Sequence, residues 1–139
     1  MINWSRLLLG GLVAGFVINV LSEVPYLWEG EMWEAANQRI GVVQPELTIG
    51  VFVFWIIFGF VLGIGSTWLY AAIRPRFGAG VKTALYTGVA VWFFFYLLPF
   101  TWLAQSGILP ARLAVSVILS HVVLMCLATV AGAWVYKEE

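Results

Sequence analysis

The chain has 139 residues, of which 63% are hydrophobic and only 10% are charged. Soluble domains average about 25% charged residues and expose most of their surface to water, so this composition indicates a protein that is largely surrounded by lipid. Seven basic and seven acidic residues give a formal net charge of zero, and no basic run is long enough for a nucleic-acid interface. With one Cys, one His and no Asp, the chain lacks the residues for a disulfide framework, a Cys–His metal cluster or aspartyl catalysis.

Four segments are apolar enough to cross a bilayer, at about residues 5–28, 47–73, 81–103 and 109–136. A membrane-spanning helix needs about 20 mostly apolar residues. The first segment meets Glu23 early, and it becomes long enough if Glu23 lies near the membrane surface and the helix continues towards Trp28. The pattern therefore predicts an all-α integral membrane four-helix bundle, with residues 1–139 forming a single transmembrane domain.

The segment after the first span predicts a short helix of its own. Residues 31–40 carry acidic side chains in the first turn and Arg39 in the last, and Gly41 follows as a stop. We expect this helix to lie on the outer interface or to cap the bundle. The alternative is an irregular loop that is anchored by Trp33.

Proline and glycine predict the other boundaries. Pro45 and Pro110 suit the first turns of spans two and four, where a missing N–H is tolerated. Arg74-Pro75-Arg76 is expected to end span two, and the glycines at 78 and 80 to allow a tight reversal.

Basic residues predict the orientation, because cytoplasmic loops carry an excess of Lys and Arg. Arg39 and Arg112 fall on one side, and the other five fall on the side of the termini: Arg6, Arg74, Arg76, Lys82 and Lys137. We therefore expect a multi-pass protein of a bacterial inner membrane with both termini in the cytoplasm. Arg74, Arg76 and Lys82 would set this topology and could also attract anionic lipid headgroups.

The two halves of the chain resemble each other at their boundaries. Pro25-Tyr26-Leu27-Trp28 and Pro99-Phe100-Thr101-Trp102 share a Pro-aromatic-x-Trp pattern near the ends of spans one and three. Trp68-Leu69-Tyr70 and Trp134-Val135-Tyr136 share a Trp-x-Tyr pattern near the ends of spans two and four. Two parallel helix-hairpin repeats would explain this, and chance recurrence of interfacial aromatic residues is the alternative.

Small residues at four-residue spacing predict close helix contacts. Gly11 and Gly15 lie in span one, Gly59 and Gly63 in span two, and Gly132 in span four. Such residues let two helices approach closely. The contacts would form within the bundle or in a homodimer interface.

Intramembrane polar residues are the first place to look for function. At about 1.5 Å per residue, Asn19 and His121 lie at similar depth, with Glu23 one turn nearer the outer surface. These three side chains could line an outward-facing polar pocket, to which Ser116, Ser120 and Gln105 could add polar groups. A Glu–His pair there could take up and release protons near neutral pH. Alternatively, Glu23 pairs with Arg112 or reaches the headgroups, and His121 is a structural hydrogen-bonding residue.

The opening Ile2-Asn3-Trp4, the Gly- and Ala-rich first span, the Trp-bearing outer segment and the three further spans resemble the DUF1761 family of small four-helix bacterial membrane proteins. That resemblance implies the same helical layout and no assigned activity. No nucleophile elbow, zinc-protease helix or phosphate loop is present, so we expect no enzyme and no cofactor. The sequence favours a structural or accessory protein that packs against the bilayer and against itself or a larger complex. A small-solute or proton-coupled transporter is the alternative.

Overall fold

The computed structural model describes residues 2–43 and 48–136. Its elements in chain order are α1 (Trp4–Ile40), α2 (Ile49–Phe77), α3 (Val81–Trp92), the π-helix η1 (Phe93–Leu97), α4 (Leu98–Gln105) and α5 (Ala111–Val135). Since α3, η1 and α4 follow one another without a break, the chain has four helical segments long and apolar enough to cross a membrane. This confirms the all-α class and the four segments. The predicted start of span two at residues 45–47 and the basic Lys137 lie outside the described residues.

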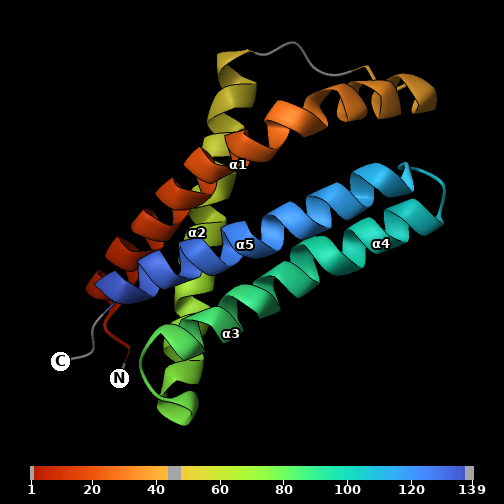
Figure 1. Cartoon of the computed structure of the whole chain (residues 1–139). Helices are drawn as coiled ribbons and strands as arrows, with labels where there is room; N and C mark the ends of the chain where they lie inside the picture. Colours follow the sequence, from red (N-terminus) through yellow and green to blue (C-terminus); the bar gives the residue numbers. More distant parts are fainter. Residues whose placement is uncertain (1, 44–47, 137–139) are drawn as a thin grey trace.

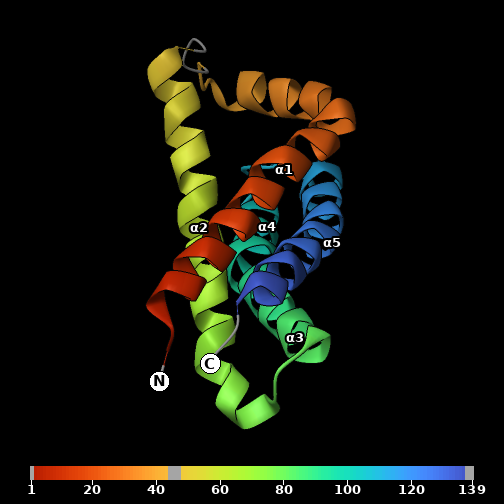
Figure 2. The same cartoon turned by 90° about the vertical axis from the view of Figure 1, so that its left-hand side faces the viewer.

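α1 is longer than we predicted. It has 37 residues, contains Pro25, and ends only at Gly41, whose positive φ of 70° suits glycine. The segment 31–40 is therefore helical and stops where we predicted, but it is the last part of α1 and not a separate helix. This last part is turned relative to the first (Figure 2), and a proline within a helix is a common cause of such a bend.

α2 also passes the predicted boundary. The helix begins after Thr48, whose hydroxyl accepts from the backbone N–H of Val51, and it runs through Arg74-Pro75-Arg76 to Phe77. Pro75 has no N–H to bond to the carbonyl of Ala71, but the helix continues past it, and the carbonyl of Arg74 accepts from Gly78. The reversal follows at Gly78 and Gly80, both with positive φ.

The third segment contains one irregular turn. In η1 the N–H of Leu98 bonds to the carbonyl of Phe93, five residues back instead of four. Pro99 follows directly, in the first turn of α4. α5 then starts at Ala111, so Pro110 precedes its first turn rather than lying within it.

α5 lies between α1 and the α3–α4 segment, and α2 crosses α1 (Figures 1 and 2). α1 packs most extensively on α2 and α5, and α3 packs on α5. Apolar clusters fill the interior at three levels. The middle one includes Ile18, Leu62 and Met125. The start of α1 and the end of α5 lie on the same side as the turn between α2 and α3 (Figure 1); we call this the terminal side, and the opposite side the distal side.

Two stretches contain no fully buried residue. One is the first ten residues of α2, 49–58. The other is η1 with α4, where Tyr96, Phe100 and Leu103 are partly buried against the distal cluster. Among the described residues, the backbone of α2 approaches that of α3 but not that of η1 or α4. α2 and the α3–α4 segment therefore diverge towards the distal side (Figure 1).

Candidate functional site

The main polar cluster of the interior centres on Glu29. This residue lies in the last part of α1 and is only 2% exposed. Its Oε1 accepts hydrogen bonds from Ser116 Oγ at 2.8 Å and Ser120 Oγ at 3.2 Å. The two serines are four residues apart on α5, so they lie on one face of that helix, where both reach the same carboxylate oxygen.

The cluster continues on both sides of the carboxylate. Trp28 Nε1 donates to Ser116 Oγ at 3.1 Å. His121 Nδ1 lies 2.9 Å from the carbonyl oxygen of Val117 and 3.0 Å from Ser120 Oγ. A carbonyl only accepts, so the contact with Val117 requires Nδ1 to carry the ring proton. The single hydroxyl hydrogen of Ser120 can go to Glu29 Oε1 or to the carbonyl of Val117, both at 3.2 Å. Ser120 Oγ therefore lies within hydrogen-bond distance of both the imidazole and the carboxylate.

Aromatic rings extend the cluster towards the third segment. The ring of His121 stacks on that of Tyr96, with centroids 4.3 Å apart. Tyr96 stacks in turn on Phe100 at 6.2 Å, and the edge of Trp33 meets Phe100 at the same distance. The rings come from α5, η1, α4 and α1, so this column joins the distal parts of three spans.

The chemistry available here is the binding of a proton or the holding of a charge. A carboxylate in an apolar environment needs hydrogen-bond donors, and two serine hydroxyls supply them. Within the described part of the chain, no three His, Cys or Glu side chains come together as a metal site would require. The cluster also joins helices, since every hydrogen bond to Glu29 crosses from α5 to α1.

The predicted polar pocket is divided in the structure. Asn19 turns to α2, where its Nδ2 donates to the carbonyl of Ile56 at 3.2 Å, and it also donates to Gly15 at 2.9 Å. Glu23 is exposed. Of the three predicted residues, His121 alone belongs to the cluster around Glu29. We predicted that Glu23 would be the acidic residue near His121, but the structure places Glu29 there, with Ser120 between them.

Glu29 was missed because span one was expected to end near Trp28, which placed Glu29 in an acidic outer loop. Once α1 continues, Glu29 faces α5. The usable signal was the pair Ser116 and Ser120, two hydroxyls one turn apart in an otherwise apolar span.

The predicted packing glycines all lie at contacts within the chain. An added Cβ at Gly11 would be 2.7 Å from the Cα of Ile64, and one at Gly15 2.7 Å from the Cα of Phe60. At Gly59 it would meet the side chain of Asn19, and at Gly63 the backbone of Gly15.

Gly132 completes a crossing of three helices. A Cβ there would lie 2.9 Å from the carbonyl oxygen of Gly10 on α1 and 2.7 Å from Thr67 Oγ1 on α2. The chain's own helices cover these small residues. Of the two alternatives, contacts within the bundle and a homodimer interface, the structure shows the first at these glycines.

The basic residues of the α2–α3 turn differ in their surroundings. The guanidinium of Arg74 is partly buried and lies 5.5 Å from the centre of the Tyr136 ring. Arg76 and Lys82 are exposed, and Lys82 Nζ lies 5.9 Å from the centre of the Tyr86 ring. Arg74 therefore takes part in packing, while the other two cations face outward.

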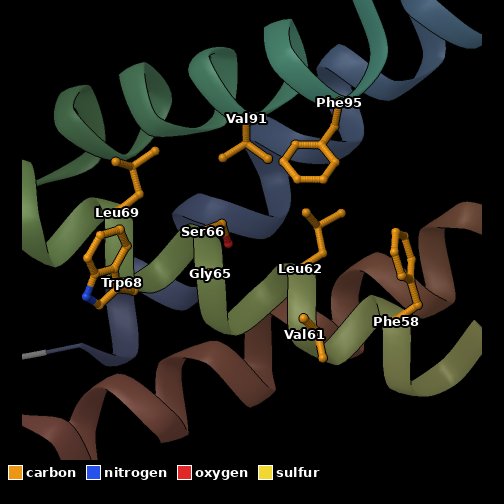
Figure 3. Close-up of a pocket in the computed structure, with 9 residues that line it drawn as sticks. All are labelled: Phe58, Val61, Leu62, Gly65, Ser66, Trp68, Leu69, Val91 and Phe95. Carbon is orange, nitrogen blue, oxygen red and sulfur yellow. The ribbon is translucent and has the colours of Figure 1, made fainter. Parts of the chain in front are cut away.

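An apolar groove of about 350 Å³ lies between α2 and the third segment (Figure 3). Its lining is Phe58, Val61, Leu62, Gly65, Ser66, Trp68 and Leu69 from α2, with Val91 and Phe95 opposite. The hydroxyl of Ser66 donates to the carbonyl of Gly63 at 2.8 Å, so the groove presents almost purely apolar surface.

Comparison with protein-family models, with curated proteins and with solved structures gives no match. The resemblance to the DUF1761 family therefore stays a prediction. So does the internal repeat, although Tyr70 and Tyr136, the equivalent tyrosines of the two Trp-x-Tyr patterns, do meet edge to face with ring centres 6.1 Å apart.

Proposed function

We propose that this chain is a structural protein of the membrane that acts by packing its helices against a second copy of itself. In this proposal it crosses a bacterial inner membrane four times, with the terminal side in the cytoplasm. The excess of basic residues on the terminal side supports that orientation. Four helical segments of sufficient length and hydropathy support the multi-pass arrangement.

The observation that carries the proposal is the opening between α2 and α4. No residue of 49–58 in α2 is fully buried, and none in η1 or α4 is, although Tyr96 and Phe100 pack against the distal cluster. We call the opening between these stretches the wedge. The helices on its two sides carry large exposed side chains, among them Phe54 and Trp55 on α2, and Leu98 and Trp102 on α4.

The wedge is suited to a second copy because one chain supplies both the opening and a helix that fits it. The walls carry no charged residue, so an occupant must be apolar. Residues 49–58 are themselves an apolar helical end that stands away from the core. A two-fold axis along the membrane normal would place this end of each copy in the wedge of the other, which satisfies both surfaces at once.

Self-association can be measured by energy transfer between donor- and acceptor-labelled protein in phosphatidylcholine vesicles. We expect transfer above the random level, decreasing as lipid is added. Trp55→Ala and Trp102→Ala remove wedge side chains, and truncating a central aromatic residue typically costs about 2 kcal/mol or more, roughly 30-fold in affinity. Trp134→Ala is the matched control, because Trp134 is 82% exposed at the terminal end of α5.

Transfer that stays at the random level for the unaltered protein would reject the proposal. Equal loss of transfer in Trp134→Ala and in the wedge variants would reject the wedge as the interface.

A proton-coupled transporter is the second candidate, and the buried Glu29 favours it. A carboxylate held between two hydroxyls and connected to an imidazole can take up and release a proton. In vesicles carrying an internal pH dye and an imposed pH gradient, this candidate predicts proton flux that Glu29→Gln abolishes. Glu23→Gln, which alters an exposed carboxylate on the same helix, should leave the flux unchanged. Flux equal to that of protein-free vesicles would exclude it.

A further inference from the structure

We propose that the groove between α2 and the third segment binds an acyl chain of an anionic phospholipid, whose phosphate lies against Arg76 on the terminal side. The groove adjoins the wedge at Phe58 and Phe95, but the rest of its lining lies nearer the terminal side, and the test below separates lipid binding from self-association.

The groove itself selects an apolar chain. Its volume of about 350 Å³ lies in the range of roughly 300–1,000 Å³ that small-molecule sites occupy. Ser66 is the polar residue of its lining, and the hydroxyl is already bonded to Gly63. A hydrocarbon chain therefore loses nothing on entering, whereas a polar solute would leave hydrogen bonds unmade.

The position of Arg76 gives the groove a charged end. Leu62 and Leu69 line the groove and are seven residues apart on α2. Arg76 follows after seven more residues, so it lies nearly on the same face, about two turns or 10 Å beyond Leu69 towards the terminal side. Its exposed guanidinium has the planar fork of donors that suits a phosphate.

Other residues around the groove also favour a lipid whose headgroup lies on the terminal side. Trp68, which lines the end nearer Arg76 (Figure 3), is of the residue type that favours the boundary between lipid tails and headgroups. Lys82 is exposed at the start of α3 and adds positive charge to the same turn. No charged residue occurs from 48 to 73 or from 83 to 105. The ligand must therefore be an amphiphile with its anionic end on the terminal side.

The test is native mass spectrometry of the full chain in detergent, with phosphatidylglycerol or phosphatidylcholine added at equal concentration. We expect one phosphatidylglycerol per chain to be retained in preference to phosphatidylcholine. Gly65→Leu should remove that retention, because Gly65 lines the groove and an added Cβ there meets no atom within 4 Å. Gly50→Leu adds the same side chain to the exposed start of α2 and should not alter it.

Arg76→Gln should weaken the binding of phosphatidylglycerol about fivefold, the typical effect of one basic residue beside an anionic lipid surface. Arg112→Gln is its control, since Arg112 is exposed on the distal side. Equal retention of the two lipids, or retention that survives Gly65→Leu, would overturn the proposal. The proposal would also be overturned if Gly65→Leu dissociated a dimer without changing lipid retention, because the groove would then bind protein and not lipid.

Discussion

The contact between α1 and α2 gives the sharpest stability prediction, because two glycines of one helix have opposite surroundings. A Cβ added at Gly63 would lie against the backbone nitrogen of Gly15 and 2.6 Å from the carbonyl oxygen of Gly11. A Cβ added at Gly65, two residues further along α2, would meet nothing within 4 Å. Replacing each by alanine therefore makes the same chemical change in two different environments.

The expected magnitudes follow from two effects of opposite sign. Alanine is favoured over glycine inside a helix by about 1 kcal/mol, so Gly65→Ala should raise the free energy of unfolding by up to that amount. Gly63→Ala gains the same helix propensity, but the added methyl group would push the backbone of α2 away from that of α1. No flexible side chain lies between them to move aside. Overpacking of this kind costs about 1–3 kcal/mol. We expect Gly63→Ala to be less stable than Gly65→Ala by about 2 kcal/mol.

The assay is reversible unfolding in mixed micelles of dodecyl maltoside with increasing SDS, followed by far-ultraviolet circular dichroism. Both variants should show the same helical signal before unfolding, with the midpoint of Gly63→Ala at a lower SDS fraction. If Gly63→Ala unfolds at the same fraction as Gly65→Ala, then α1 and α2 do not approach as closely as described, and the role given to the glycines is wrong.

Three further substitutions can be measured in the same unfolding assay. Glu29→Ala should lower stability by about 1–3 kcal/mol because it removes the carboxylate that accepts from the partly buried Ser116 and Ser120. Glu29→Gln retains an acceptor oxygen and should cost less; equal losses would argue against the hydrogen bonds. Asn19→Leu should cost about 1 kcal/mol through loss of the bond to the carbonyl of Ile56, and an unchanged midpoint would show that this bond contributes nothing. Thr67→Val should be neutral or stabilising, since the buried Thr67 Oγ1 has no hydrogen-bond partner, and a clear loss of stability would reveal one.

The sequence was sufficient for the helical segments but not for their pairing. Length and hydropathy determine where a chain can cross a membrane, and the four segments begin within two residues of the predicted starts, although α1 runs twelve residues past its predicted end. The boundaries that shifted are those at proline: Pro25 does not end α1, and Pro75 does not end α2. A proline removes one hydrogen bond, and a long apolar helix tolerates that loss when its other bonds remain.

The identity of the buried acid depended on the geometry of two helices. Glu23 and Glu29 both lie in the second half of α1, and no local pattern distinguishes them. The two side chains differ in burial because α1 continues and bends. This places Glu29 beside the serines of α5, while Glu23 stays exposed. His121, which we predicted to share a pocket with Asn19 and Glu23, lies instead beside Ser120.

The single π-turn in the third segment decides which side chains of α4 face α5. In an uninterrupted α-helix, residues four apart drift by about 40° per step, so a row such as Gly88, Trp92, Tyr96 and Phe100 would wind off its partner. The extra residue in η1 resets that phase: Trp92 bonds to the carbonyl of Ile118, Tyr96 stacks on His121, and Phe100 still packs inward. Deleting one residue of η1 would rotate α4 by about 100° and turn its apolar row away from α5. The helix would remain as hydrophobic and nearly as long, but its side chains would no longer meet α5, so hydropathy alone would not reveal the loss of packing.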